Sequence, residues 1–244
     1  MKLSVVIPAY NEQICIGQVV LRLAKELELN DIDYEVILVN DNSTDSTLDV
    51  LAALTKDNPR VKAVNSIQPR GFGWAIRQGL DSISGDAVVI FMGDGSDDPN
   101  DVVRYLNKLK EGYDCVFGSR FIKESKVVGY PWIKFILNRA GNKLIQSLFF
   151  LKYNDISNAF KAYRVGVIKA IQPLISQYFN ITVEMPLKAI VRGFSYAVIP
   201  IHWNGRDSGV SKYHIKELSR KYFFSILFVW LEKMLLKEEI KRHA

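Results

Sequence analysis

The chain has 244 residues, of which 48% are hydrophobic, and a formal net charge of +6 at pH 7. This length and composition favour one α/β domain with a buried core, and no DNA- or RNA-binding pattern is recognisable, which excludes nucleic acid as a partner. Lys2 is followed at once by the strand-like Leu3–Ile7 and Pro8, unlike a secretory signal peptide. Cys15 and Cys115 lie far apart, which fits two reduced thiols better than a disulfide framework. We therefore expect the protein to face the cytoplasm.

Strand-like apolar runs alternate with helix-like segments along the first 120 residues. The runs cover residues 3–7, 34–39, 61–64, 88–92 and 113–117, and the intervening helices end near residues 29, 56, 82 and 110. Regular alternation predicts a parallel sheet with right-handed crossovers and helices on both faces. The carboxyl ends of the strands then share one edge, which is where ligands bind in open α/β sheets.

The run at residues 88–92 stops abruptly in an acidic segment that contains Asp94, Asp97 and Asp98 before Pro99. Desolvated carboxylates repel one another, so these side chains are either solvated or neutralised by a cation. Oxygen ligands without nearby His or Cys favour Mg²⁺ or Mn²⁺. The alternative is a polar turn before a helix, with Asp98 as its N-cap and Pro99 in its first position.

Other charged residues also follow strands or lie in a strand-to-helix loop. Asp41 follows the second run, Arg70 precedes the third helix, and Arg120 follows the fifth run. Glycines in the loop around Arg70, including Gly71, permit close backbone approach. The topology is expected to bring these residues together with Asp94 and Asp97 at one edge of the sheet.

Three segments carry a family resemblance: residues 5–12 (VVIPAYNE), residues 39–45 (VNDNSTD) and the acidic strand end. Together they resemble the family 2 glycosyltransferases, whose GT-A fold is a Rossmann-like, mostly parallel α/β sheet flanked by helices. The resemblance implies that Asp94 and Asp97 hold the metal. It implies a nucleotide-sugar site made of Pro8, Ala9, Tyr10, Glu12, Asp41, Arg70, Gly71 and Asp94.

The acidic segment departs from the Asp-x-Asp motif of that family. Counted back from Pro99, Gly95 stands where the second aspartate is expected. Asp94 is therefore the first predicted metal ligand and Asp97 the second.

After Arg120 the pattern changes. Pro131 introduces a helix to about Leu151, with apolar residues at helical spacing. We interpret it as a surface helix with a solvated basic face formed by Asn138, Arg139, Asn142 and Lys143. Residues 155–164 are predicted to form a polar loop before a helix at about 165–175. A helix at 182–192 containing Glu184 and a late strand at 196–201 are also predicted.

The following loop, residues 203–212, contains Arg206 and Lys212 with glycines and hydroxyls between them, a composition suited to closing on phosphate oxygens. Together with Arg120, residues 155–164 and Glu184, it resembles the dolichol-phosphate mannosyltransferase-like branch, which transfers sugar to polyprenyl phosphates. The resemblance implies acceptor-phosphate contacts from Arg120, Arg139, Arg206, Ser211 and Lys212. It implies a catalytic set of Asp94, Asp97, Arg120, Arg206 and Lys212. Asn158, Ala159 and Lys161 depart from the usual Gly-Phe-Arg of that branch.

The C-terminal segment is basic and apolar. From Ser211 onward there are eight Lys or Arg against four Glu, and residues 222–231 form a ten-residue apolar run. As a helix this run is about 15 Å long, roughly half the hydrocarbon core of a bilayer. Cations on both sides favour an amphipathic helix lying in a membrane interface. A helix docked into the protein or into a dimer is the competing interpretation, and the sequence does not predict an oligomeric state.

These observations predict a GT-A catalytic domain over residues 1–210 and an interfacial helix over 211–244. Residues 1–120 would form its nucleotide-sugar half and 121–210 its acceptor half. The resemblance implies inverting transfer from a UDP- or GDP-sugar to a polyprenyl phosphate of the dolichyl or undecaprenyl type. It also implies peripheral attachment at the cytoplasmic face of a membrane. One alternative is a family 2 transferase acting on a saccharide or protein hydroxyl, with Asp98 or Glu184 as base. Another is an inactive nucleotide-binding or membrane-scaffold protein.

Overall fold

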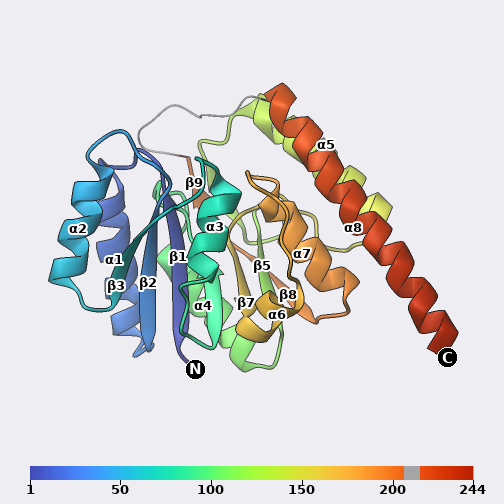
Figure 1. The fold of residues 1–244 in the computed structure, drawn as a ribbon, viewed down its shortest axis with the longest axis horizontal. Coiled ribbons are helices and arrows are strands. Elements are labelled where there is room, and N and C mark those ends of the chain that lie inside the picture. The colour runs from blue at the N-terminus through green and yellow to red at the C-terminus, as the bar shows by residue number, and fades with distance from the viewer. Residues whose placement is uncertain (206–214, 244) are drawn as a thin grey trace.

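A computed structural model of the chain describes residues 1–205 and 215–243, with side chains described through residue 205 and from 220 to 236. The described residues form a seven-stranded sheet of order β3-β2-β1-β4-β7-β5-β8, flanked by helices (Figure 1). Its strands are β1 (Leu3–Ala9), β2 (Tyr34–Asn40), β3 (Val61–Asn65), β4 (Ala87–Ile90), β5 (Cys115–Ser119), β7 (Lys161–Arg164) and β8 (Tyr196–Pro200). The helices are α1 (Ile16–Leu29), α2 (Thr47–Asp57), α3 (Phe72–Leu80), α4 (Pro99–Lys110), α5 (Trp132–Phe149), α6 (Val165–Ala170), α7 (Ile181–Val191) and α8 (Ile215–His243). The predicted α/β class with a mostly parallel sheet is confirmed.

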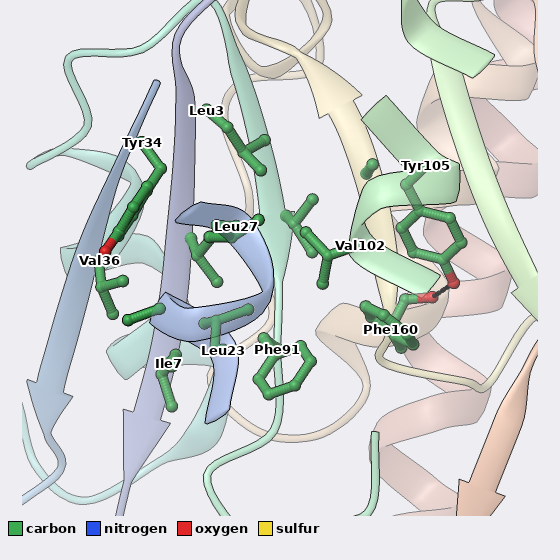
Figure 2. Packing of buried hydrophobic residues seen from close by; sticks show 14 of the residues in the cluster. Leu3, Ile7, Leu23, Leu27, Tyr34, Val36, Phe91, Val102, Tyr105 and Phe160 are labelled. Atoms are coloured by element: carbon green, nitrogen blue, oxygen red, sulfur yellow. Dashed lines mark hydrogen bonds between the residues drawn. The ribbon is translucent and has the colours of Figure 1, made fainter. Parts of the chain in front are cut away.

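The apolar runs that form β1, β2 and β4 have both of their faces covered. β1 pairs in parallel with β2 on one side and β4 on the other, and every residue of these three strands is buried. One core cluster joins the sheet to α1, α2 and α4. Figure 2 shows Leu23 of α1 beside Phe91, and Tyr105 of α4, whose hydroxyl donates to the Phe160 carbonyl at 2.9 Å. A second cluster covers the opposite face with α3, α5, α6 and α7.

The predicted polar loop at residues 155–164 is wrong in its second half, because Lys161–Arg164 forms β7. This strand lies antiparallel between β4 and β5, in the middle of the sheet. Charged residues at both of its ends hid it from pattern analysis. The fully buried Lys161 ammonium donates to the carbonyls of Ile156, at 2.9 Å, and Thr182, at 3.1 Å. Burial lowers the pKa of Lys161 to about 7.

Several predicted boundaries also shift. β5 begins two residues later than expected because Asp114 belongs to a turn, where its carboxylate accepts hydrogen bonds from the amide and hydroxyl of Ser195. α6 ends at Ala170 and not near residue 175, since Pro173 removes a helical hydrogen-bond donor and disfavours helix before it. A small parallel pair, β6 (Lys126–Val128) and β9 (His202–Asn204), was not predicted.

The polar flank of α5 faces the protein, so the predicted solvated basic face is wrong for most of its members. Asn142 is buried, and its amide donates to the Ser157 hydroxyl at 3.0 Å, while the amide of Asn138 donates to the same hydroxyl at 2.8 Å. The polar segment around residue 157 attracts this flank through hydrogen bonds. The apolar stripe consequently points outward and leaves exposed Trp132, Ile133, Phe135, Ile136, Leu137, Leu144 and Leu148.

Helix α8 lies alongside α7 and α5 at one side of the molecule (Figure 1). Val229 and Ser225 face inward, whereas Phe223, Phe224 and Leu231 are exposed. Apolar side chains therefore occupy both the inward and the outward face of its described part, which is not the simple amphipathic pattern expected. Across the described residues, no helix has the length and apolar character needed to cross a membrane.

Candidate functional site

The loops after β1 and β2 are joined to each other at the carboxyl edge of the sheet. The Asp41 amide donates to the Ala9 carbonyl at 2.8 Å, directly after the paired ends of the two strands. The Asn11 amide donates to the Ser43 hydroxyl at 3.1 Å, and the Glu12 amide to the Thr47 hydroxyl at 2.8 Å. β1 runs through Pro8 and Ala9, so the predicted nucleotide loop starts directly on this edge.

Asp41 organises the loop that precedes α3. Its two carboxylate oxygens accept the Gly71 amide at 2.9 and 3.0 Å. Arg70 turns back over the ring of Tyr10, 4.7 Å from its centroid, and donates to its hydroxyl at 3.0 Å. Burial raises the pKa of Asp41 to about 6, against the opposing effects of the Gly71 amide and Arg70. The structure thus brings together four of the predicted nucleotide-sugar residues from three separate loops.

Asp94 and Asp97 lie in a tight turn after β4, and both are buried, with exposed fractions of 8% and 4%. The Met92 amide donates to Oδ2 of Asp97 at 3.0 Å, and the Ser96 amide to Oδ1 of Asp94 at 3.1 Å. Gly95 between them has φ of +77°, where an L-residue such as aspartate is strained. Backbone geometry therefore explains why the second position of the Asp-x-Asp motif holds glycine here.

The donor set of this turn suits a hard divalent cation. Burial and the neighbouring Asp94 charge raise the pKa of Asp97 to about 8, against the opposing effects of the Met92 amide and of Arg120. Among the described residues, no group of three or more His, Cys, Asp or Glu side chains gathers to enclose a metal. Two carboxylates fit the way Mg²⁺ is held in phosphate-transfer sites, where substrate oxygens and water complete the coordination.

Asp98 is the helix cap that the alternative interpretation predicted. Its carboxylate accepts the Asn100 amide at 3.0 Å, and Pro99 occupies the first turn of α4. Its other oxygen lies 3.6 Å from Nδ1 of His202 on β9. These contacts commit Asp98 to the start of α4.

Arg120 pairs with Asp155, a residue that was not singled out by itself in the sequence. Nε and Nη2 of the guanidinium donate to the two carboxylate oxygens at 2.8 Å each, and the Arg120 amide donates to one of them at 3.0 Å. The Asp155 carboxylate raises the pKa of Arg120 despite its burial. The guanidinium also lies 5.3 Å from the centroids of the Phe121 and Tyr130 rings.

Arg139 of α5 reaches the same segment. It donates to the Asn154 carbonyl at 2.9 Å and lies 4.6 Å from the centroid of the Phe121 ring. Arg120 and Arg139 therefore converge on residues 154–155 and on Phe121. Residues 154–158 read Asn-Asp-Ile-Ser-Asn, and this cluster of polar residues around one isoleucine is the sequence signal that could have indicated a buried polar network.

Strand β9 carries the chain to the acidic turn. Trp203 forms an isolated bridge with Asp97, and the Asn204 amide donates to the Ser96 carbonyl at 3.0 Å. Trp203 also contacts the ring of Tyr130, with centroids 5.0 Å apart. The predicted residues Arg206, Ser211 and Lys212 lie outside the described residues.

Glu184 does not fit the base role that the hydroxyl-acceptor alternative requires. It is fully buried, and its carboxylate accepts the amides of Ile175 and Ser176 at 2.8 and 2.7 Å. Lys188 lies 3.2 Å away as an ion-pair partner. The glutamate is committed to holding the segment before α7.

The fold and this site define the class of protein. The model of glycosyl transferase family 2 matches residues 4–172, and the chain belongs to that family.

Curated relatives narrow the comparison. The chain is 30% identical over 89% of its length to undecaprenyl-phosphate 4-deoxy-4-formamido-L-arabinose transferase of Enterobacter sp. (strain 638), of which it spans 64%. It is 29% identical over 85% of its length to polyprenol monophosphomannose synthase of Mycolicibacterium smegmatis, covering 79% of that protein. Dolichol-phosphate mannosyltransferase of Pyrococcus furiosus is 28% identical over 87% of the chain, with 59% of the relative covered. The chain thus spans less than two thirds of two of these relatives.

Solved structures bear out the GT-A fold. Glucosyl-3-phosphoglycerate synthase from Mycobacterium tuberculosis in complex with UDP superposes with a TM-score of 0.71 at 18% identity, over 94% of this chain and 80% of that one. The structure of the same enzyme with Mn²⁺, UDP and phosphoglyceric acid superposes with a TM-score of 0.71 at 19% identity, and the match covers 94% of this chain and 78% of that one. At this identity the likeness concerns the fold.

Proposed function

We propose that the protein transfers a sugar from a nucleotide-diphosphate sugar to a polyprenyl phosphate. The observation that carries the proposal is the alignment of more than four fifths of the chain with three transferases named for undecaprenyl, polyprenol or dolichol acceptors. The buried acidic turn at the carboxyl edge of the sheet supports it, because this edge is where nucleotide ligands bind in such sheets.

The donor nucleotide would bind across the ends of β1 and β2. Asp41 and the backbone around Gly71 would contact the base, and Tyr10 with Arg70 would form a flat wall beside it. Pro8, Ala9 and Glu12 would line the remaining part of this edge. The donor would be a UDP- or GDP-sugar.

Asp94 and Asp97 would hold Mg²⁺ or Mn²⁺ against the donor diphosphate. When bound, the cation supplies positive charge that stabilises the diphosphate as it leaves. The two aspartates would fix its position through the tight turn at Gly95 and through the hydrogen bond from the Met92 amide.

In the proposed reaction an oxygen of the acceptor phosphate attacks the anomeric carbon and inverts it. A bond forms between that oxygen and the carbon, and the bond from the carbon to the donor diphosphate breaks, with the electron pair leaving on the diphosphate. A phosphate monoester is already largely ionised at pH 7, so no protein base is needed. The commitment of Asp98 to a helix cap and of Glu184 to a buried ion pair agrees with this chemistry.

Positive groups would draw in and orient the acceptor phosphate. Arg139, beside the ion pair of Arg120 with Asp155, would form one wall of the acceptor-phosphate site. Arg206, Ser211 and Lys212 would form the other wall. The described chain supports this arrangement up to Gly205, because Trp203 and Asn204 contact the acidic turn directly before these three residues.

The outward apolar faces of α5 and α8 would rest on the membrane that contains the acceptor. The two helices touch where Lys233 donates to the Phe149 carbonyl at 3.1 Å. Trp132 and Phe150 are 71% and 88% exposed, more than such large apolar side chains usually are in water. Arg220 and Lys143 are exposed on the same two helices, where they would meet anionic headgroups. We propose a peripheral position on the cytoplasmic face.

The transfer reaction is tested by incubating the full chain with labelled UDP- and GDP-sugars and Mn²⁺. Short-chain polyprenyl phosphate, the corresponding polyprenol without phosphate, and soluble saccharides serve as parallel acceptors. We expect chloroform-extractable label with the phosphate alone. Label in a soluble saccharide would instead support the hydroxyl-acceptor alternative, and no label with any donor would contradict the proposal.

Membrane docking is tested by co-sedimentation with vesicles that contain phosphatidylglycerol. Ile136→Glu on α5 should reduce the bound fraction several-fold, because it places a charge in the apolar face. Leu21→Glu on α1 is the matched control, since Leu21 is similarly exposed on a helix of the opposite layer. Equal binding by Ile136→Glu and the unmodified chain would contradict the docking surface.

A further inference from the structure

The turn that holds Gly71 is packed against the backbone of a distant segment. We call residues 70–74 the Gly71 turn and residues 176–179 the backing segment. A Cβ placed on Gly71 would lie 2.5 Å from the Gln177 carbonyl oxygen, and one on Gly73 would lie 2.4 Å from the Ser176 carbonyl oxygen. Such distances are far below van der Waals contact, so the two segments touch through bare backbone.

Two further contacts join these segments. The Trp74 amide donates to the Gln177 carbonyl at 3.2 Å, and the rings of Phe72 and Phe179 stack with centroids 4.0 Å apart. The start of α3 is thus aligned by the backing segment from one side. Asp41 holds it from the other through the Gly71 amide.

The backing segment is itself held by a buried polar triangle. The hydroxyls of Ser176 and Ser225 lie 3.0 Å apart. The side-chain amide nitrogen of Asn180 donates to both hydroxyls, at 2.8 Å to Ser176 and 2.7 Å to Ser225. Ser176, Ser225 and Asn180 are 2%, 3% and 6% exposed. Hydrogen bonds inside such an apolar environment fix geometry more strongly than at a surface.

Ser225 belongs to α8, the helix whose outer face carries the exposed phenylalanines. Two neighbours on α8 reach the same segment: the Tyr222 hydroxyl donates to the Phe179 carbonyl at 3.2 Å, and the Lys221 ammonium lies 3.3 Å from the centroid of the Tyr178 ring. α8 therefore supports the backing segment along its whole length.

We propose that Ser225 is a positioning residue for the nucleotide site, acting from α8 through Asn180 and Ser176 on the Gly71 turn. The assignment of a nucleotide to this turn rests on the proposed function, whereas the mechanical connection rests on the contacts alone. Loss of the Ser225 hydroxyl should loosen the turn whose Gly71 amide donates to Asp41. Donor affinity should fall, while acceptor affinity should not change.

Val229 supplies the matched control. Val229 lies one turn beyond Ser225 on α8 and is fully buried in the core cluster that packs against α3, α5, α6 and α7. Its side chain has no polar group. Val229→Ala weakens the packing of α8 without touching the polar triangle. A difference between the two variants separates positioning by the hydroxyls from general docking of the helix.

The experiment compares the full chain with its Ser225→Ala, Ser176→Ala and Val229→Ala variants. Hydrogen exchange of the Gly71 and Trp74 amides is measured first, followed by titration with UDP and with GDP in the presence of Mn²⁺. Either substitution removes two of the three hydrogen bonds of the triangle. If about 1 kcal/mol of this loss reaches the Gly71 turn, exchange of both amides should speed up about fivefold in Ser225→Ala and Ser176→Ala. The Kd of the nucleotide should rise by about the same factor, and Val229→Ala should lower Tm without either change.

Unchanged exchange at Gly71 and Trp74 in both serine variants would overturn the proposal, as would equal effects from Val229→Ala. Ser176→Ala keeps the test decisive where Ser225→Ala does not fold, because it leaves the bond between Asn180 and α8 in place. If the unmodified chain binds neither UDP nor GDP, the proposed nucleotide site fails. The exchange rates still decide whether α8 positions the turn.

Discussion

The two halves of the proposed site are built by different means. On the proposed donor side, Ala9, Asp41 and Asp97 are placed by the ends of parallel strands and by hydrogen bonds to backbone amides. On the proposed acceptor side, Arg120 and Arg139 are placed by side-chain contacts with residues 154–155, beside an antiparallel strand. Residues at strand ends are placed by the topology of the sheet. Residues held by a buried polar network keep their positions only while each side chain of the network is present.

The largest expected effect is on the donor side, at the acidic turn. Asp97→Asn removes a charged metal ligand and should lower kcat about 1,000-fold, the scale of losing a key electrostatic contact in a transition state. Burial already favours the uncharged form of Asp97, so a neutral asparagine should leave Tm equal or slightly higher. Turnover and thermal unfolding of one preparation measure both effects, and a joint loss of activity and Tm would contradict the assigned role.

On the acceptor side we expect a loss of stability instead. Asp155→Ala leaves the Arg120 guanidinium buried without its partner, and the free energy of unfolding should fall by about 3 kcal/mol. Urea unfolding measures the change. Lys108→Ala, which breaks an exposed ion pair with Glu111, is the control and should leave the free energy of unfolding nearly unchanged. Equal losses in the two variants would show that the Arg120 pair is not structural.

A third prediction concerns the backbone contact behind the donor site. Gly71→Ala should destabilise the protein by about 2 kcal/mol and raise the donor KM, because the added methyl meets the Gln177 carbonyl. Gly166→Ala in α6 is the matched control, since nothing lies within 4 Å of its Cβ position. It should be neutral or slightly stabilising. A neutral Gly71→Ala would contradict the close packing of the turn.

The smallest expected effect is a pH dependence of metal affinity. Because the pKa of Asp97 is raised to about 8, the metal-free site holds a proton that the cation must displace. Mn²⁺ affinity should therefore fall about fivefold from pH 8 to pH 7 and about tenfold more from pH 7 to pH 6. The stability of the metal-free protein should change with pH in the opposite direction to Mn²⁺ affinity. Asp97 binds more protons in the folded state than in the unfolded state, so the free energy of unfolding should fall as pH rises toward 8. Calorimetry in two buffers measures the released proton, and pH-independent affinity would contradict the prediction.

The positions of the proposed donor-side residues could be predicted because their signals are local. Apolar runs placed the strands, Asp41 comes directly after the second run, and Asp94 and Asp97 lie in the turn after the fourth run. The acceptor side needed information that periodicity does not contain. β7 has only four residues and begins with a buried lysine, and the inward face of α5 is polar because Asn138 and Asn142 bind Ser157. Helical spacing identified the stripe on α5 correctly but not the direction in which it points.

The separation of the two halves is tested most directly by two-substrate steady-state kinetics of the unmodified chain, Asp41→Asn and Arg139→Ala. Loss of one charged hydrogen bond at a binding site changes affinity by about tenfold. We predict that Asp41→Asn raises the KM for the nucleotide sugar by about this factor and leaves the KM for polyprenyl phosphate unchanged. Arg139→Ala should do the reverse. If both variants raise the same KM, the division of the site into a donor half and an acceptor half is wrong.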